Sequence, residues 1–311
     1  MCVRAMCHRA QVSRMRYAPC VSWLRRVVSG RAGRTGAALV AVLVGVAVIG
    51  PWLSSAEPGA IDLDHGLTAL GAPLAPAAHG PLGTDPLGRD VWARLIAGAG
   101  GSLGVAGLAT ALALLIGVTV GVGAGYAGGR IDRVLMRLVD LVLAFPALLL
   151  AILLAAVLRE SALGGTSAPV IITLALVGWT SIARVVRARA RVITRADHVE
   201  AARALGASSW RVVVHHVLPS LVGIIVVLAS IGFAQNLLAE SALSYLGLGP
   251  PPPAPTWGRM IAEAQPYSRS APQRLRAPGL AIGAAVAGFQ LLGAGLAAAV
   301  DPRATRPGGA P

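Results

Sequence analysis

The segment DHVEAARALGASSWRVVVHHVLPS, residues 197–220, interrupts a chain that is otherwise strongly apolar. It carries acids, arginines and two adjacent histidines, while long runs of Val, Leu, Ala and Ile lie on both sides of it. The whole chain of 311 residues is 55% hydrophobic and only 13% charged, and soluble domains carry about twice that charged fraction. The apolar runs must therefore account for the fold, and the polar interruption needs an explanation of its own.

Six apolar stretches are long enough, or nearly long enough, to cross a bilayer, which takes about 20 mostly apolar residues. A soluble protein of this size could not bury six such helices. The sequence therefore predicts an all-α integral membrane protein with six transmembrane helices. The stretches are Gly36–Leu53, Ser102–Tyr126, Val134–Leu158, Ala168–Ala183, Leu218–Leu238 and Pro278–Val300, of which the fourth is the shortest.

The net charge of +14 comes from 27 arginines, with no lysine, and the distribution of these arginines indicates topology. With residue 1 inside, the segments 1–35, 126–137, 184–217 and 300–311 lie inside and hold 20 of the 27 arginines. This positive-inside bias places both termini in the cytoplasm, and it explains the charge better than nucleic-acid binding does. The arginines of the last outer loop run against the bias: Arg259, Arg269, Arg274 and Arg276.

The predicted topology divides the chain into five parts. Residues 1–35 are a basic cytoplasmic tail, 36–56 the first transmembrane helix, 57–97 an extracytoplasmic loop, 98–300 a core of five transmembrane helices, and 301–311 a cytoplasmic tail. The arginine-rich start resembles that of a signal peptide, but the first apolar run is longer than a signal core, which favours an uncleaved helix. All three cysteines fall in the first tail, so we expect neither an outer disulfide nor a metal site.

Local patterns add detail to the spans. Turns are expected at Gly83 and Gly88, followed by a short amphipathic helix at the outer interface, formed by Val91, Trp92, Leu95 and Ile96. Small residues recur every fourth position of the second span, a pattern of close helix packing: Gly117, Gly121 and Gly125. In the third span Arg137 and Asp140 can pair at i,i+3, and Pro146 predicts a kink.

The polar segment 197–219 reads as helix, turn, helix. In the first helix Ala201, Ala202 and Leu205 are expected to form one smooth face. Glu200 and Arg203 can pair on the opposite side. Gly206 offers a helix stop, and Ser208 or Ser209 can cap a second helix. That helix has an apolar stripe of Trp210, Val213, Val214 and Val217.

Two other interpretations of this segment remain open on pattern alone. Arginine-rich amphipathic helices also lie on the inner leaflet of a membrane. The adjacent His215 and His216 suggest a metal site, but neighbouring residues of a helix point about 100° apart, which disfavours a site made of both.

The sequence EAARALG, residues 200–206, with Leu218-Pro219 after it, resembles the signature loop of ABC importer permeases. In that family the loop is a coupling helix that docks into a groove on a cytoplasmic ATPase subunit. The resemblance implies that Glu200 supplies a charged contact, that Ala201, Ala202 and Leu205 allow close approach, and that Gly206 provides a sharp exit. The general pattern has isoleucine where this chain has His216, and histidine is frequent there in the dipeptide/oligopeptide branch.

Further stretches resemble the C-type permeases of peptide and nickel importers, so that the resemblance covers about residues 36–303. Two departures occur near the end: Ala294 stands where an acid is usual, and SRSAPQRLRA, residues 268–277, replaces an aromatic stretch. The similar stretches are GTDPLGRDVWARLIAGA, LVDLVLAFPALLLAI, ESALSYLGLGPPPPAPTWGRMIAEA and APGLAIGAAVAGFQLLGAGLAAAVDPR.

The resemblance implies the fold of a type I ABC importer permease in the bacterial inner membrane. The expected partners are a second homologous permease in a heterodimer, two cytoplasmic ATP-binding subunits and an extracytoplasmic substrate-binding protein. The chain is expected to be no enzyme and to bind no cofactor, because it has no phosphate loop and no lysine to complete one. ATP is therefore expected on the partner subunits.

Polar residues near the outer half of the fifth span, Gln235, Asn236 and Glu240, are expected either to line the pathway or to pack against the partner permease. The cargo, whether dipeptide, oligopeptide or nickel, is left open. The alternative function is a stand-alone channel or secondary transporter, which should show a filter or paired broken helices; no clear repeat or filter is seen.

Overall fold

The computed structural model describes residues 30–53, 57–69, 71–76 and 80–300. Most of both predicted tails, and residues 54–56 of the first predicted span, lie outside these ranges. The elements are α3 Arg31–Leu53, α4 Val91–Ala127, α5 Gly129–Leu143, α6 Ala147–Arg159, α7 Ala168–Ile193, α8 Asp197–Ala204, α9 Ser209–Val212, the π-helix η1 Val213–Val217, α10 Leu218–Tyr245, α11 Trp257–Ala264, the 3₁₀-helix η2 Gln265–Tyr267 and α12 Pro272–Val300.

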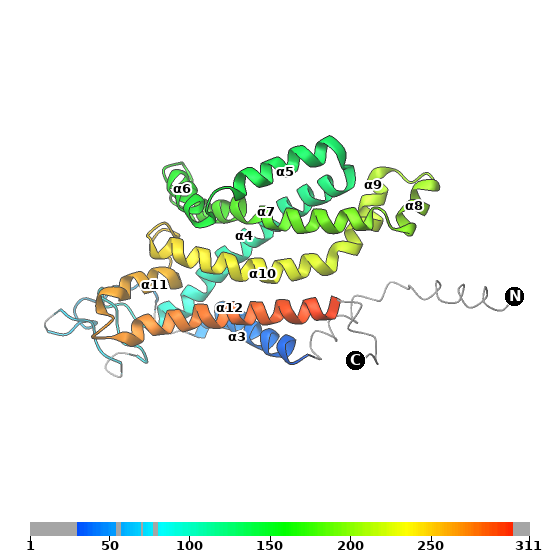
Figure 1. Cartoon of the computed structure of the whole chain (residues 1–311). Coiled ribbons are helices and arrows are strands. Elements are labelled where there is room, and N and C mark those ends of the chain that lie inside the picture. The colour runs from blue at the N-terminus through cyan, green and yellow to red at the C-terminus, as the bar shows by residue number, and fades with distance from the viewer. Residues whose placement is uncertain (1–29, 54–56, 70, 77–79, 301–311) are drawn as a thin grey trace.

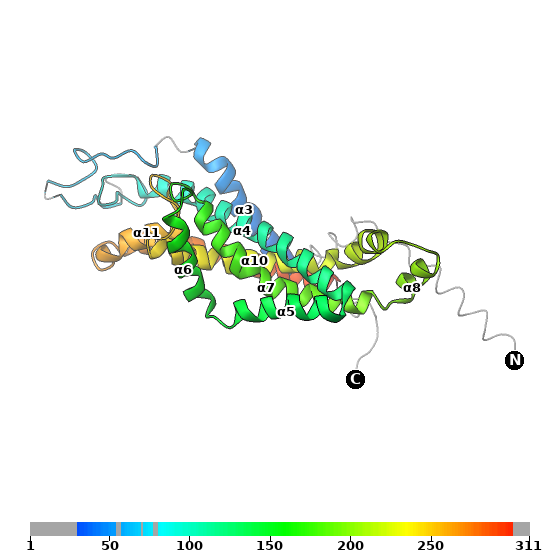
Figure 2. The same cartoon turned by 90° about the horizontal axis from the view of Figure 1, so that it is seen from above.

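The described helices form an elongated bundle. Five of them, α3, α4, α7, α10 and α12, are long and apolar enough to cross a membrane, and the bent pair α5–α6 supplies a sixth passage. The predicted six-helix membrane fold is thereby confirmed. One end of the bundle carries α8 and α9, and the other carries α11 and the loop of residues 57–90 (Figure 1, with a view from above in Figure 2). The start of α3 and the end of α12 lie toward the α8 end.

The third passage is broken, where the sequence predicted only a kink. The axes of α5 and α6 differ by 88°. Pro146 precedes α6 with a non-helical ψ of 120°. A proline has no N–H to donate and its ring clashes with the carbonyl four residues earlier, and it also disfavours helical geometry at Phe145 before it. Three residues, Ala144 to Pro146, separate the two helices, and the extended ψ of Pro146 lets the chain turn through nearly a right angle.

The predicted short helix at the outer interface is not a separate element. It forms the first turns of α4, a single helix of 37 residues. Asp90 caps this helix, because its carboxylate accepts hydrogen bonds from the backbone N–H groups of Trp92 at 2.7 Å and Ala93 at 3.3 Å.

Helices α4 and α7 approach each other closely along the predicted glycine stripe. A Cβ atom added at Gly117 would lie 2.7 Å from the Ile182 Cβ, and one added at Gly121 would lie 2.7 Å from the Ala183 carbonyl oxygen. At Gly125 the same atom would lie 2.7 Å from the Ala190 Cβ. These distances leave no room for a methyl group, so the stripe fixes α4 against α7.

Ion pairs hold α5 against α7. Asp132, at the start of α5, accepts hydrogen bonds from Arg187 through both carboxylate oxygens and also pairs with Arg191 at 3.2 Å. Asp140 pairs with Arg184 at 2.7 Å. The predicted pair of Asp140 with Arg137 is therefore wrong, because a partner on the neighbouring helix occupies that carboxylate.

We predict that Gly121→Ala lowers the stability of the purified protein by about 1–3 kcal/mol, because the added methyl group forces α4 and α7 apart. Gly104→Ala, in the same helix, is the matched control, since its Cβ position has no neighbour within 4 Å. Thermal unfolding in detergent measures the difference. Equal melting temperatures for the two variants would contradict the close contact.

Candidate functional site

The polar segment forms two short helices that project from one end of the bundle (Figure 1). Helix α8 has Asp197 and Glu200 in its first turn, where acids interact favourably with the helix dipole. Helix α9 begins after Ser208, whose hydroxyl oxygen accepts a hydrogen bond from the Arg211 backbone N–H at 3.4 Å. The predicted helix–turn–helix is present.

Gly206 ends α8 in the way the sequence predicts. Its φ is +83°, a left-handed conformation that glycine adopts without strain. The Gly206 N–H donates to the Arg203 carbonyl at 2.9 Å, and the Ala207 N–H donates to the Ala202 carbonyl at 3.1 Å. This pair of bonds is a Schellman motif. No atom lies within 4 Å of a Cβ added at Gly206, so only the backbone conformation requires glycine there.

Valines attach the segment firmly to the bundle. Val199 of α8, Val212 of α9 and Val217 of η1 are completely buried. They belong to one apolar cluster with residues of α7, namely Ile182, Val186 and Ala190. The Arg203 guanidinium lies 5.0 Å from the centre of the Tyr126 ring at the end of α4, a favourable cation–π arrangement. The segment is thus held to both α4 and α7.

The outer surface of the segment carries large exposed apolar side chains among charged ones such as Asp197 and Arg211. The Leu205 side chain is 89% exposed and Trp210 is 77% exposed. Glu200 and Ala201 are exposed, and Ala202 is half-buried. The predicted ion pair between Glu200 and Arg203 is not formed among the described residues, because Arg203 is turned toward Tyr126. At α8 and its exit, the small or apolar residues Ala201, Ala202, Leu205 and Gly206 therefore offer a smooth, accessible face.

The predicted stripe of the second helix is partly correct. Val217 is completely buried as predicted, and Val213 and Val214 are half-buried, but Trp210 is exposed and the buried Val212 was not predicted. The helix contains the π-turn Val213–Val217, in which the Leu218 N–H donates to the Val213 carbonyl. A π-turn at this place relieves the clash that Pro219 would create with the carbonyl four residues before it.

The two histidines do not act together. The His215 Nδ1 atom lies 3.2 Å from the Arg211 carbonyl oxygen, while the His216 ring lies 6.2 Å from the His198 ring. No group of three His, Cys, Asp or Glu side chains that could hold a metal ion occurs in the residues the structure describes.

A cavity of about 540 Å³ lies beside the break between α5 and α6. Helices α7 and α10 form its other walls, and its polar residues are Thr180, Ser181, Gln235 and Asn236. The Asn236 amide donates to the Thr110 hydroxyl at 2.9 Å, which fixes its orientation. Gln235 is exposed. Two of the three predicted pathway residues therefore line one cavity.

Glu240, the third of these residues, lies elsewhere. It is completely buried, and the Ser244 hydroxyl donates to its carboxyl group at 2.6 Å. Ser102 of α4 lies beside the same carboxyl group and accepts a hydrogen bond from the Trp257 backbone N–H at 3.1 Å. Glu240 is thus part of a polar contact between α4, α10 and α11 and does not line the cavity.

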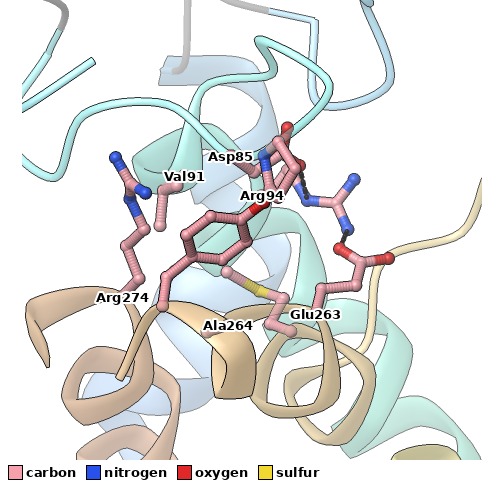
Figure 3. Close-up of a pocket in the computed structure, with 9 residues that line it drawn as sticks. Asp85, Val91, Arg94, Glu263, Ala264 and Arg274 are labelled. Carbon is pink, nitrogen blue, oxygen red and sulfur yellow. Dashed lines mark hydrogen bonds and ion pairs between the residues drawn. The ribbon is translucent and has the colours of Figure 1, made fainter. Parts of the chain in front are cut away.

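The opposite end of the bundle contains a network of ion pairs (Figure 3). Glu263 of α11 pairs with Arg94 at 2.7 Å and with Arg89 at 3.0 Å. Asp85 pairs with Arg89 at 2.6 Å and lies 3.5 Å from the Arg94 Nε atom. Figure 3 shows the Arg94 guanidinium between the two carboxylates, with Arg274 on the other side of the same pocket. The network joins the loop of residues 57–90 to α4 and α11.

Other arginines at this end bind backbone carbonyls. Arg274 donates to Leu74 at 2.8 Å, Arg259 to Pro250, and Arg159 to Gly247. Partial burial lowers the pKa of Arg259, and the nearby Glu263 carboxylate opposes this shift. The arginines that ran against the charge bias are thus partly explained, since Arg259 and Arg274 stabilise loops. Nothing in the structure explains Arg269 and Arg276.

Comparison with known proteins agrees with this architecture. The family model described as "Binding-protein-dependent transport system inner membrane component" matches residues 117–306. The chain belongs to this family. It is 36% identical to a putative peptide transport system permease protein of Brucella suis over 92% of each chain. It is 34% identical to a dipeptide transport system permease protein of Alkalihalophilus pseudofirmus, over 86% of this chain and 84% of the other.

A third relative is named for the transport of a different cargo. The permease is 38% identical to a glutathione transport system permease protein of Pectobacterium atrosepticum, over 71% of this chain and 72% of that protein. Membership in a binding-protein-dependent family makes the chain a multi-pass inner-membrane subunit that works with an ATPase and a binding protein. It is not itself the catalytic subunit and binds no cofactor, and the stand-alone channel is set aside.

Sequence reasoning missed several functional residues of the permease. Thr180 and Ser181 in the cavity looked like ordinary polar residues of a span. Arg94 and Glu263 are 169 residues apart, so no local spacing could pair them. The sequence did contain a signal for Arg94 and Glu263, because a charged residue close to an apolar run usually has a protein partner.

We predict that Glu263→Gln destabilises the permease by about 1–3 kcal/mol. The loss leaves Arg94, which is 2% exposed, with one carboxylate, and it is smaller than for a fully buried pair because Glu263 is 31% exposed. Asp62→Asn is the control, since Asp62 lies in the same loop but its carboxylate contacts only the neighbouring His65 among the described residues, through the backbone N–H and the ring at 3.5 Å. Equal melting temperatures for the two variants in thermal unfolding would show that the network does not hold this end together.

Proposed function

We propose that this permease imports small peptides and that residues 197–217 are its docking segment for an ATPase subunit. It pairs with a second homologous permease, two ATP-binding subunits bind on the cytoplasmic side, and a substrate-binding protein delivers cargo on the other side. Both termini lie in the cytoplasm. The observation that carries the proposal is an exposed apolar face on a segment that is rigidly attached to the spans.

The docking role is supported by the contrast between the two sides of the segment. On its inner side three valines are completely buried. On its outer side Leu205 is 89% exposed, and it lies at the end of the short helix α8, outside the helices long enough to span a membrane. An exposed leucine in water is unfavourable by roughly 1.5–3 kcal/mol relative to a buried one. A partner that covers Leu205 and approaches the small residues Ala201 and Ala202 recovers this energy.

The orientation is supported by charge. The segments 126–137 and 184–217, at the α8 end of the bundle, carry ten arginines. At the other end, four of the arginines are held in ion pairs or by backbone carbonyls: Arg89, Arg94, Arg259 and Arg274. Three of the ten, Arg184, Arg187 and Arg191, pair with Asp140 or Asp132. The other seven outnumber Asp197 and Glu200, the acids of these segments that remain, so basic charge is in excess at the α8 end, which the positive-inside rule assigns to the cytoplasm.

The apolar cluster provides a path for motion. ATP shifts the importer only if it binds one arrangement of the ATPase subunits better than another. A displacement of α8 acts directly on Val199, and through the same cluster on Ile182 of α7 and Leu221 of α10. These two helices also form walls of the 540 Å³ cavity. Movement of the docking segment therefore changes the shape of the cavity.

The cargo class is supported by the chemistry of that cavity. Its lining consists of apolar side chains with two hydroxyl groups near the middle of α7 and two amides on α10, and it includes no carboxylate, imidazole or thiol. Hydroxyl and amide groups exchange hydrogen bonds with peptide units, whereas nickel prefers imidazole and other nitrogen or sulfur ligands. The names of the relatives, which specify peptide, dipeptide and glutathione transport, point the same way.

We predict that Gly206→Val abolishes most ATPase association and peptide uptake while membrane insertion stays normal, because a β-branched residue does not tolerate a φ of +83°. Gly206→Asn should retain much of both activities, since asparagine accepts this conformation at a helix end. Co-purification of the ATPase subunits and uptake of labelled peptide measure the effect.

The matched control for this substitution is Gly128→Val. Gly128 has a φ of +62° with no atom within 4 Å of an added Cβ, so the strain is similar but lies between α4 and α5. The proposal fails if Gly206→Val binds ATPase as well as wild type, or if Gly128→Val loses it equally.

We also predict that Gln235→Ala combined with Asn236→Ala changes the order in which unlabelled peptides compete for uptake, by several-fold for at least some peptides. ATPase association should be unchanged. Ser244→Ala, on the same helix but beside the buried Glu240, is the control and should leave the order intact. An unaltered order in the double variant would mean that these amides only pack against the partner permease.

A further inference from the structure

A second, strongly apolar groove lies on the docking-segment side of the bundle. It has a volume of about 710 Å³ and runs along one face of α4 from Ala111 to Tyr126. Leu218 and Ile225 of α10 form the opposite wall, and Trp210 and Val213 of the docking segment close one end. Two residues of its α4 wall carry hydroxyls: that of Thr119 already donates to the Leu115 carbonyl at 2.7 Å, and Tyr126 lies at the end of the wall. The groove therefore offers almost no polar group to a ligand along its length.

The groove suits an acyl chain better than a helix of another subunit. Close helix packing in membranes uses small residues, and the small-residue stripe of α4 is already covered by α7. The face that remains presents bulky side chains, among them Leu115, Val118 and Val122. The 16 residues from Ala111 to Tyr126 span about 22 Å, whereas one leaflet has about 15 Å of hydrocarbon. The groove thus reaches through one leaflet and into its interface.

The end of the groove near the docking segment has the features of a headgroup site. Trp210 is 77% exposed there, and tryptophan and tyrosine are favoured at membrane interfaces. The Arg203 guanidinium lies 5.0 Å above the Tyr126 ring at this end of the groove. Of the seven arginines in the segment 184–217, three are paired with Asp132 or Asp140 of α5. The other four, Arg189, Arg195, Arg203 and Arg211, still outnumber Asp197 and Glu200. The local charge therefore attracts a phosphate.

We propose that this groove holds an anionic phospholipid of the cytoplasmic leaflet, with an acyl chain along α4 and its phosphate at Arg203. The assignment of the leaflet rests on the proposed orientation. The lipid fills the space between α4, α10 and the Trp210–Val213 turn, so that it contacts the docking segment beside the valines that attach it. The membrane is then a structural partner of the segment, and its composition affects how firmly the segment is held.

The proposal is tested in the assembled importer, in native membranes, with a photoreactive benzoylphenylalanine at position 115 or 112. Leu115 lines the groove, whereas Leu112 is exposed on another face of the same helix. After irradiation, mass spectrometry identifies the adducts. We expect phospholipid adducts at 115 in which the anionic fraction is about fivefold higher than in bulk lipid. Arg203→Gln should return that fraction to the bulk value. An adduct of position 115 with another protein, or with lipid of bulk composition, overturns the proposal.

A second measurement does not depend on photochemistry. Gly123→Leu fills the groove, and Gly104→Leu places the same side chain in the same helix outside it; a Cβ at either site meets no atom within 4 Å. The purified importer should lose one anionic phospholipid per permease with the first variant and none with the second. Equal lipid content overturns the proposal. Peptide uptake by wild-type importer is measured in parallel, so that failure of the transport assignment is recognised separately.

Discussion

The close contact between α4 and α7 is the constraint on which the rest of the permease depends. Three glycines allow the two helices to approach to a distance at which a methyl group would clash with Ile182, Ala183 or Ala190. Lipid offers no hydrophobic drive for helices to associate, so tight packing of this kind supplies the stability. The inner end of the contact carries the valines of the docking segment, and its middle carries one wall of the cavity beside the α5–α6 break.

The docking segment and the loops at the opposite end of the molecule are attached by different kinds of contact. At the α8 end, apolar side chains attach a short segment and leave one leucine-bearing face open. At the other end, Glu263 and Asp85 bind arginines that are far apart in the chain, and carbonyls bind further arginines. Apolar contacts tolerate small displacements, whereas charge-assisted hydrogen bonds demand fixed geometry. Movement is therefore expected at the docking end and along α7 and α10, while the outer end keeps its loops in place.

Local chemistry in the sequence was sufficient for part of this structure. The six passages follow from apolar length, and Gly206 and Ser208 follow from the backbone and capping preferences of those residues. The outcomes that sequence reasoning missed depend on tertiary context. Pro146 predicted a bend, but its 88° depends on how α6 packs. A π-turn precedes Pro219, and in that helix Val212 is buried and Trp210 exposed, against the predicted stripe, while Val217 is buried as predicted. Asp140 pairs with Arg184 on the neighbouring helix and not with Arg137. Glu240 lies in a polar contact that no local pattern specifies.

The central claim is that residues 197–217 face the cytoplasm and bind an ATPase subunit there. The most direct measurement replaces Cys2, Cys7 and Cys20 with serine, introduces Leu205→Cys, and adds a short thiol-to-amine cross-linker to vesicles of either orientation. The account predicts an adduct with the ATPase subunit, formed readily in inside-out vesicles and decreased by an excess of free ATPase. Labelling of position 205 by an impermeant reagent in right-side-out vesicles, or no adduct in either orientation, would contradict it.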